Sequence, residues 1–333
     1  MTYDAFLLLS FGGPEGPDDV LPFLANVTRG RGVPPERLAE VAGHYRHFGG
    51  VSPINEQCRA LIAALQPHLD LPVYWGNRNW HPMLADTLRT MRADGIQRAV
   101  AFVTSPYGGY SACRQYWEDI ARARAEVGDG APEVDKIRHY HDHPGFVEPF
   151  ADAVRAAWTP GARLVFTAHS IPVAMEVHSG PDGHRYTAQL NETAALVAAA
   201  AGVGEWDLVW QSRSGPATVA WLEPDVNDHL EALAKAGATA VVAAPIGFVS
   251  DHLEVIWDLD NEAAATADGL GIDWRRVATP GTDPRFVAMV AELVAERTSA
   301  AQRRKLGELP VWDACPLDRS PVGCCTIPGR THR

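Results

Sequence analysis

Short apolar runs, many of them rich in β-branched residues, alternate with amphipathic stretches along the whole chain. Eight of these runs predict strands: Ala5–Ser10, Val73–Trp75, Ala99–Val103, Lys136–Tyr140, Leu164–Thr167, Leu208–Gln211, Ala240–Ala244 and Arg275–Ala278. Amphipathic stretches between them predict helices, among them Leu84–Ala93, Val147–Trp158, Thr187–Ala201 and Val226–Ala236. This alternation of strands and helices indicates right-handed βαβ units and parallel sheets.

The eight predicted strands divide into two groups of four near residue 160. We therefore expect an α/β fold with two Rossmann-like halves, residues 1–158 and 159–284, each a four-stranded parallel sheet flanked by helices. Two such halves facing a shared cleft form the simplest architecture. A further helical pattern, Arg285–Gln302, is predicted to cross back to the first half, so that residues 285–333 form a C-terminal segment.

The composition is that of a soluble globular protein and argues against some classes of partner. Hydrophobic residues make up 46% and charged residues 21% of the 333 positions, which is typical of a soluble globular chain. No apolar run reaches the roughly 18 residues that span a membrane, and the start lacks a basic segment of the secretory type, so we expect a cytoplasmic protein. The net charge of −12 argues against nucleic acid as the main partner.

Three acidic residues recur every four positions after the predicted strand Ala240–Ala244. In a helix, Glu254, Asp258 and Glu262 fall along one face, where they repel one another unless a cation lies among them. A solvated acidic face is the alternative. Because this helix begins directly after a strand, at the sheet edge where ligands bind in open α/β folds, we favour a site that handles a metal ion.

A histidine follows another predicted strand of the same half. His169 comes directly after Leu164–Thr167 and Ala168, and its unperturbed pKa near 6.5 suits proton transfer at neutral pH. A hydrogen-bonded structural histidine is the alternative. Because His169 and Glu254 both follow strands of one sheet, their loops can converge on one pocket. An imidazole with carboxylates is a ligand set for borderline divalent metals such as Fe²⁺.

The five cysteines are unevenly spread. Cys58 lies in a predicted helix and is expected to be a core residue, whereas Cys315, Cys324 and Cys325 lie in a Pro- and Gly-rich segment that core packing does not explain. Their spacing resembles no common zinc site. Iron–sulfur clusters require four thiolates, and Cys113 is better placed than Cys58 to supply the fourth. An exposed redox-sensing trio is the alternative.

Basic side chains gather in the first half, around Arg29, Arg31, His44 and Arg46. The turn at 49–53 then leads into a helix capped near Ser52. Arginines and helix starts together suit carboxylate or phosphate groups, although surface arginines are common.

Five segments, taken in order, resemble the ferrochelatase family, whose members insert Fe²⁺ into a porphyrin. These are LLSFGGP at 8–14, GGVSPI at 49–54, TAHSIP at 167–172, VWQSRSGP at 209–216 and the acidic stretch at 245–262. The resemblance covers nearly the whole chain and implies a class II chelatase-like fold around a porphyrin cleft. It implies that His169 lies over the ring centre, that Glu254 faces it, and that Asp258 and Glu262 lead outward as a metal path.

The resemblance also implies a [2Fe–2S] cluster on Cys113, Cys315, Cys324 and Cys325. Their C-terminal spacing resembles the actinobacterial version, for which the expected substrate is coproporphyrin III, with four propionates, and the product is coprohaem. Phe11 stands where related enzymes without the cluster carry a tyrosine that can ligate the product iron, so His169 would be the sole axial ligand. Porphyrin contacts are expected from eight residues: Phe11, Arg29, Arg31, His44, Arg46, Ser52, Tyr116 and Trp221.

Several alternatives remain open from the sequence. Protoporphyrin IX is the rival substrate, a cobalt or nickel chelatase is a rival enzyme, and a porphyrin or haem carrier is the non-catalytic reading. A carrier has no need of the acidic strip Glu254, Asp258 and Glu262, which favours an enzyme. We expect a monomer, with possible transient contacts to a membrane or to another enzyme of haem synthesis.

Overall fold

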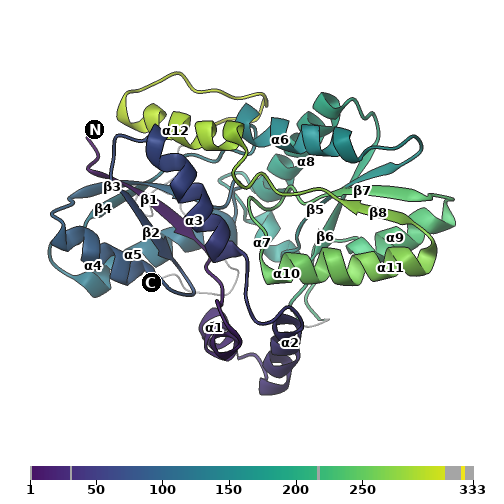
Figure 1. The fold of residues 1–333 in the computed structure, drawn as a ribbon, viewed down its shortest axis with the longest axis horizontal. Helices are drawn as coiled ribbons and strands as arrows, with labels where there is room; N and C mark the ends of the chain where they lie inside the picture. Colours follow the sequence, from purple (N-terminus) through teal and green to yellow (C-terminus); the bar gives the residue numbers. More distant parts are fainter. Residues whose placement is uncertain (1, 31, 216–217, 312–323, 327–333) are drawn as a thin grey trace.

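The computed structural model describes residues 2–30, 32–215, 218–311 and 324–326 (Figure 1). The predicted site residues Arg31 and Cys315 therefore lie outside the described residues. Within the described residues the strands form two separate four-stranded parallel sheets, as predicted.

The first sheet has the strand order β2-β1-β3-β4, formed by β1 (Ala5–Ser10), β2 (Val73–Asn77), β3 (Arg98–Val103) and β4 (Glu133–Lys136). Every residue of β1 is buried, because helices cover both faces of the sheet. One face packs on α4 (Leu84–Ala93) and α5 (Gln115–Val127). The other packs on α3 (Ile54–Leu65).

The second sheet has the order β6-β5-β7-β8, formed by β5 (Arg163–His169), β6 (Trp206–Gln211), β7 (Ala240–Ala244) and β8 (Asp273–Arg276). Alternate residues of β5 point to opposite faces. Val165 packs toward α9 (Val226–Lys235) and α11 (Ala264–Leu270), whereas Phe166 packs toward α6 (Pro144–Ala157) and α8 (Arg185–Ala201).

The two sheets share one hydrophobic core. Phe102 of the first sheet, Phe166 of the second and Phe286 of α12 (Pro284–Thr298) belong to the same buried cluster. The C-terminal helix α12 packs against α6 and α3 (Figure 1). The described chain therefore brings its last helix back to the first half, while the exact domain boundaries near residues 158 and 284 stay predictions.

Further helices lie outside the layers that cover the two sheets. Helices α1 (Val20–Val27) and α2 (Pro35–His47) pack on each other and project from the first half, with α2 next to α10 (Leu253–Ile256) of the second half (Figure 1). Helix α7 (Val173–Val177) follows β5. None of the helices in the described ranges is both long and apolar enough to cross a membrane.

Two strand predictions were displaced along the chain. β4 ends at Lys136, where the predicted strand Lys136–Tyr140 was to begin. Ile137 and Tyr140 of the predicted strand are apolar because they pack in the core shared by the two sheets. They do not pair in a sheet. β8 ends at Arg276, two residues before the predicted end. The segment after β4 is thus irregular, and it carries a row of polar residues to the junction of the halves.

Candidate functional site

The carboxyl ends of the second sheet bring together the two residues that sequence reasoning singled out most strongly. His169 is the last residue of β5, and Glu254 lies on α10, which follows β7. Nε2 of His169 lies 3.8 Å from Oε2 of Glu254. Their side chains are 34% and 41% exposed, so both can be reached by a ligand.

The main chain at the end of β5 orients the imidazole of His169. Nδ1 lies 2.5 Å from the main-chain carbonyl of Ser170, and a carbonyl can only accept, so the proton is on Nδ1. In the neutral ring, the lone pair is then on Nε2, the nitrogen that faces Glu254. The hydroxyl of Tyr186 donates to the carbonyl of His169 (2.9 Å) and holds the strand end in place. This geometry suits a base or a metal ligand.

A second histidine lies close by. Nδ1 of His252 accepts from the amide of Val255 (3.3 Å) and caps the start of α10. Burial, and then the charge of His169, lower the pKa of His252 to about 3, so this ring stays neutral. Its ring lies 6.5 Å from that of Phe11, which follows β1 of the first half. The two halves therefore meet at the start of α10.

The second predicted acid, Asp258, is half-buried and accepts hydrogen bonds from two neighbours. It belongs to a π-helical segment, Trp257–Ala263, a geometry frequent at functional sites. Gln211 donates to Oδ2 of Asp258 (3.3 Å), and so does the hydroxyl of Ser212. Ser212 holds the left-handed φ of 61°, uncommon for a residue other than glycine. Burial, and then the charge of Glu254, raise the pKa of Asp258 to about 7.

A tyrosine of the first half completes this group. Burial, and then the charges of Glu254 and Asp258, raise the pKa of Tyr45 far above its ordinary value, so its hydroxyl stays protonated. Tyr45 lies on α2 and packs on Phe23 of α1 (ring centroids 5.8 Å apart). Sequence reasoning missed Tyr45, Gln211 and Ser212. The only signal for Tyr45 was its place between His44 and Arg46.

The third predicted acid lies at the surface. Glu262 is exposed, and its charge acts on His44 of α2, whose pKa is nevertheless lowered because burial outweighs it. The ring of His44 stacks on Trp257, with centroids 3.9 Å apart and planes 5° from parallel. The acids thus run from Glu254 beside His169, through the half-buried Asp258, to Glu262 beside His44.

The other predicted porphyrin contacts divide into three groups. Phe11 and Trp221 lie at the site: Phe11 near His252, and Trp221 bridged to Pro172 in the loop after His169. Arg29 and Arg46 are exposed on the α1 and α2 side.

Ser52 and Tyr116 are buried in this structure. Ser52 is 3% exposed and packs against Gly13, where a Cβ would lie only 2.6 Å from that of Ser52. Tyr116 is 4% exposed, and the guanidinium of Arg78 lies 4.6 Å from the centre of its ring. Their roles as porphyrin contacts stay predictions.

Three of the predicted cluster cysteines come together. Cys324 and Cys325 have sulfurs 3.6 Å apart, and the amide of Gly180 donates to the sulfur of Cys325 (3.2 Å). Nη1 of Arg114, the residue after Cys113, donates to the carbonyl of Cys324 (3.0 Å), so the segment of Cys113 contacts this pair. Residues 113 and 325 are more than 200 positions apart in sequence, so this gathering is a property of the fold.

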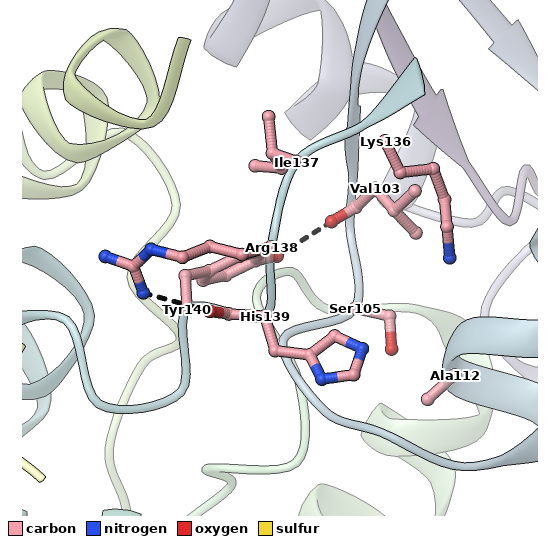
Figure 2. A pocket seen from close by; sticks show the side chains of 8 residues that line it. All are labelled: Val103, Ser105, Ala112, Lys136, Ile137, Arg138, His139 and Tyr140. Carbon is pink, nitrogen blue, oxygen red and sulfur yellow. Dashed lines mark hydrogen bonds between the residues drawn. The ribbon is translucent and has the colours of Figure 1, made fainter. Parts of the chain in front are cut away.

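Cys113 has the chemistry of a ligand. Burial would raise its pKa, but Lys136 and His139 outweigh burial and lower it to about 6. The ammonium of Lys136 lies 3.4 Å from the sulfur. Figure 2 shows Lys136 and His139 lining a small pocket, together with Ala112, the neighbour of Cys113 in sequence. Cys58 differs, since burial raises its pKa to about 11 and it packs in the core as predicted.

Comparison with known proteins gives the family. A model of the ferrochelatase family matches residues 3–298. The coproporphyrin III ferrochelatase of Nocardia farcinica is 57% identical over 342 residues, which cover 98% of this chain and 97% of the relative. The coproporphyrin III ferrochelatase of Mycolicibacterium paratuberculosis is 59% identical over 315 residues, 93% of each chain.

Solved structures support the fold alone. SirB from Bacillus subtilis with Fe³⁺ superposes with a TM-score of 0.58 at 12% identity, covering 90% of this chain and 96% of SirB. The sirohydrochlorin chelatase SirB in complex with cobalt gives 0.56 at 12% identity, covering 89% and 96%. The predicted class II chelatase-like fold is therefore confirmed. With its family match spanning both sheets, the chain belongs to the ferrochelatase family, the enzymes that insert a metal ion into a porphyrin.

Proposed function

We propose that the protein inserts Fe²⁺ into coproporphyrin III to form coprohaem in haem biosynthesis. The observation that carries the proposal is the pairing of His169 and Glu254, 3.8 Å apart, at the head of an acidic strip. The choice of porphyrin rests on relatives named coproporphyrin III ferrochelatase, which are 57% and 59% identical to this chain.

The reaction requires a base near the porphyrin nitrogens. A free-base porphyrin carries two N–H groups, so Fe²⁺ enters as two protons leave and no electron is transferred. The lone pair on Nε2 of His169 can accept one of these protons, because the other ring nitrogen donates to Ser170. Glu254, across from it, can accept a proton or hold the metal before insertion. Both residues take part in either order of deprotonation and metal entry.

The acidic strip supplies the metal in this proposal. Fe²⁺ would meet the exposed Glu262 first, then Asp258, then Glu254. The carboxyl of Asp258, whose pKa is raised to about 7, can exchange a proton for a metal ion near neutral pH. The hydroxyl of Ser212 donates to this carboxyl and orients it, and Tyr45 lies close enough for the charge of Asp258 to raise its pKa.

Exposed arginines of the first half are expected to bind the propionates. Arg29→Ala and Arg46→Ala should each lower kcat/KM for coproporphyrin III about tenfold, because each removes a charge-assisted hydrogen bond to a carboxylate. Protoporphyrin IX, with two propionates, should be affected less. Arg37→Ala is the matched control, since this exposed arginine on α2 pairs with Glu40 (2.7 Å). Equal losses for both porphyrins, or for the control, would contradict the assignment.

A [2Fe–2S] cluster on Cys113, Cys315, Cys324 and Cys325 is the second part of the proposal. The described residues fit such a group, because three buried thiols gather with Lys136 and the amide of Gly180 directed at their sulfurs. Bound there, a cluster would supply a one-electron redox centre. It has no evident part in metal insertion, so its purpose stays open, as do the predicted cytoplasmic location and monomeric state.

Colour tests the cluster. The purified protein should be reddish-brown, and Cys113→Ser or Cys324→Ser should abolish its visible absorption, because each removes a thiolate ligand. Cys58→Ser is the control, since Cys58 lies in the core and should leave the spectrum unchanged. A colourless protein, or a colour that survives both ligand substitutions, would sink the cluster assignment.

A further inference from the structure

We propose that His141, Asp142 and Glu192 form a second divalent-cation site, separate from the insertion site, which fastens the C-terminal segment to the junction of the two halves. None of these residues takes part in the reaction described above. The ligand class is a borderline first-row cation such as Zn²⁺, Fe²⁺ or Co²⁺. The proposal stands independently of the porphyrin that the enzyme uses.

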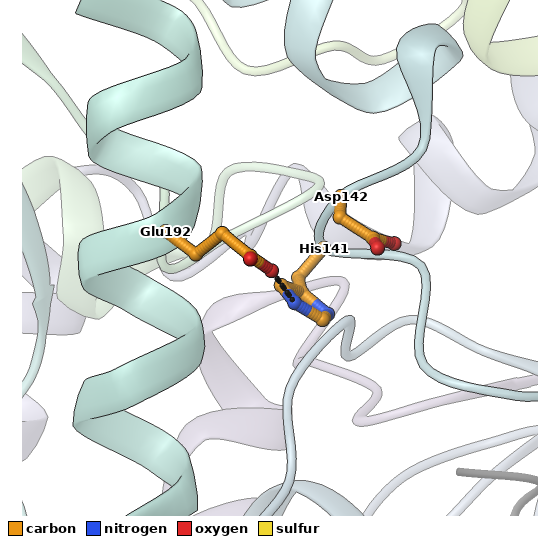
Figure 3. Close-up of side chains that lie close together, drawn as sticks. All are labelled: His141, Asp142 and Glu192. Carbon is orange, nitrogen blue, oxygen red and sulfur yellow. Dashed lines mark hydrogen bonds and ion pairs between the residues drawn. The ribbon is translucent and has the colours of Figure 1, made fainter. Parts of the chain in front are cut away.

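The three residues come from different parts of the chain. His141 and Asp142 lie in the irregular segment after β4, and Glu192 lies on α8 of the second half (Figure 3). One potential ligand atom from each lies within 4.8 Å of the others. A cation bound among them would therefore join the two halves directly.

Unsatisfied buried polar atoms point to a ligand at this place. Asp142 is 1% exposed, and neither of its carboxylate oxygens has a hydrogen-bond partner. Buried carboxylates are normally well satisfied, because an unpaired buried charge is costly. Oδ1 of Asp142 pairs with Nη1 of Arg138 at only 3.6 Å, because that guanidinium makes its shorter bonds to the carbonyl of Arg304 (2.7 Å) and to Glu296 (2.8 and 3.0 Å). A cation would supply the close contact that Arg138 does not give to these oxygens.

The donor set suits a first-row divalent cation. Nε2 of His141 lies 2.9 Å from Oε2 of Glu192, while Nδ1 is buried without a partner. Because a carboxylate oxygen can only accept, Nε2 carries a proton, and in the neutral ring the unpartnered Nδ1 offers its lone pair. One imidazole and two carboxylates match the ligands of Zn²⁺ and Fe²⁺ sites, and the two negative charges balance the cation.

Asp142 and Glu192 also accept hydrogen bonds from the segment that follows α12. The amide of Leu306 donates to the carbonyl of Asp142 (2.9 Å), and the amides of Glu308 and Leu309 donate to Oε1 of Glu192 (2.6 and 2.9 Å). Gly307 lies so close to Glu192 that an added Cβ would clash with its carboxyl. We call residues 299–311 the strap. In sequence the strap precedes the segment that carries Cys324 and Cys325, so the cation would anchor that segment.

Zinc binding to the full-length protein tests the site. Zn²⁺ is added to the purified protein and to Asp142→Asn and Glu192→Gln, excess is removed by dialysis, and zinc and iron per chain are counted separately by mass spectrometry. The expected result is one equivalent of Zn²⁺ fewer in both variants, or at least about tenfold weaker binding. Zn²⁺ bound at the insertion site should be the same in all three proteins, so it does not contribute to the difference in zinc content between them.

Controls keep the result interpretable. Both substitutions keep the size of the side chain, and circular dichroism checks that each variant is folded. Glu205→Gln, an 85% exposed side chain, should bind as much Zn²⁺ as the unmodified protein. Zn²⁺ should also slow proteolysis of the 299–311 strap in the unmodified protein and not in Asp142→Asn. Equal zinc content and equal protection in folded Asp142→Asn and Glu192→Gln would overturn the proposal.

Discussion

Replacing His169 with alanine is expected to lower kcat for Fe²⁺ insertion by at least about 100-fold, the usual contribution of a positioned base. The physical reason is the fixed tautomer, in which Nδ1 donates to Ser170 and the lone pair of Nε2 faces Glu254. Alanine removes this lone pair but leaves the walls of the site in place. The porphyrin should therefore still bind, which spectroscopic titration measures alongside the insertion rate.

A matched variant separates this effect from a general loss of histidine. His68 lies exposed after α3, far in sequence from the site residues, so His68→Ala should retain full activity. Normal turnover by the His169→Ala protein would remove the assignment of His169. Loss of porphyrin binding in step with activity would reassign His169 from chemistry to binding.

Replacing Glu254 with glutamine is expected to lower kcat by a similar factor and to move the pH profile to lower pH. Burial, and then the charge of Glu254, raise the pKa of Asp258 to about 7, so activity of the unmodified enzyme should rise with pH through about 7 as the carboxyl pair ionises. Glutamine removes the repelling charge. The remaining carboxyl should then ionise more easily, and the midpoint of the residual activity should fall.

The raised pKa of Asp258 also makes the stability of the folded protein fall as pH rises. The folded-state pKa of Asp258 is raised above the unfolded value of about 3.9, so its contribution to folding is favourable at low pH and is lost as pH rises through about 7. In Asp258→Asn this pH-dependent loss is absent, and the variant should gain in Tm relative to the unmodified protein between pH 5 and pH 8. A pH midpoint unmoved in Glu254→Gln, or no relative gain in Asp258→Asn, would contradict this account of the acid pair.

The sequence predicted the strands that are buried on both faces better than the others. Ala5–Ser10 and Ala240–Ala244 have the predicted bounds, because continuous apolar runs between turns mark strands covered by helices on both sides. β4 was displaced because Ile137 and Tyr140 are apolar for another reason, the core shared between the halves. Local periodicity carries no information about packing between distant segments.

The same distinction applies to the site. His169 and Glu254 could be predicted, since both follow strands of one sheet and their loops meet at its carboxyl edge. Tyr45 could not, because its relation to Glu254 and Asp258 arises from the packing of the first half on the second. The π-helical segment around Asp258 also escaped prediction, since a spacing of four residues suits an ordinary helix.

The central claim is that this enzyme inserts iron into coproporphyrin III. The most direct measurement compares initial rates of Fe²⁺ insertion into coproporphyrin III and protoporphyrin IX, side by side and under anaerobic conditions, over a range of porphyrin concentrations. We expect a kcat/KM at least about tenfold higher for coproporphyrin III, because two additional propionates each gain a charge-assisted contact. Equal values, or a preference for protoporphyrin IX, would contradict it.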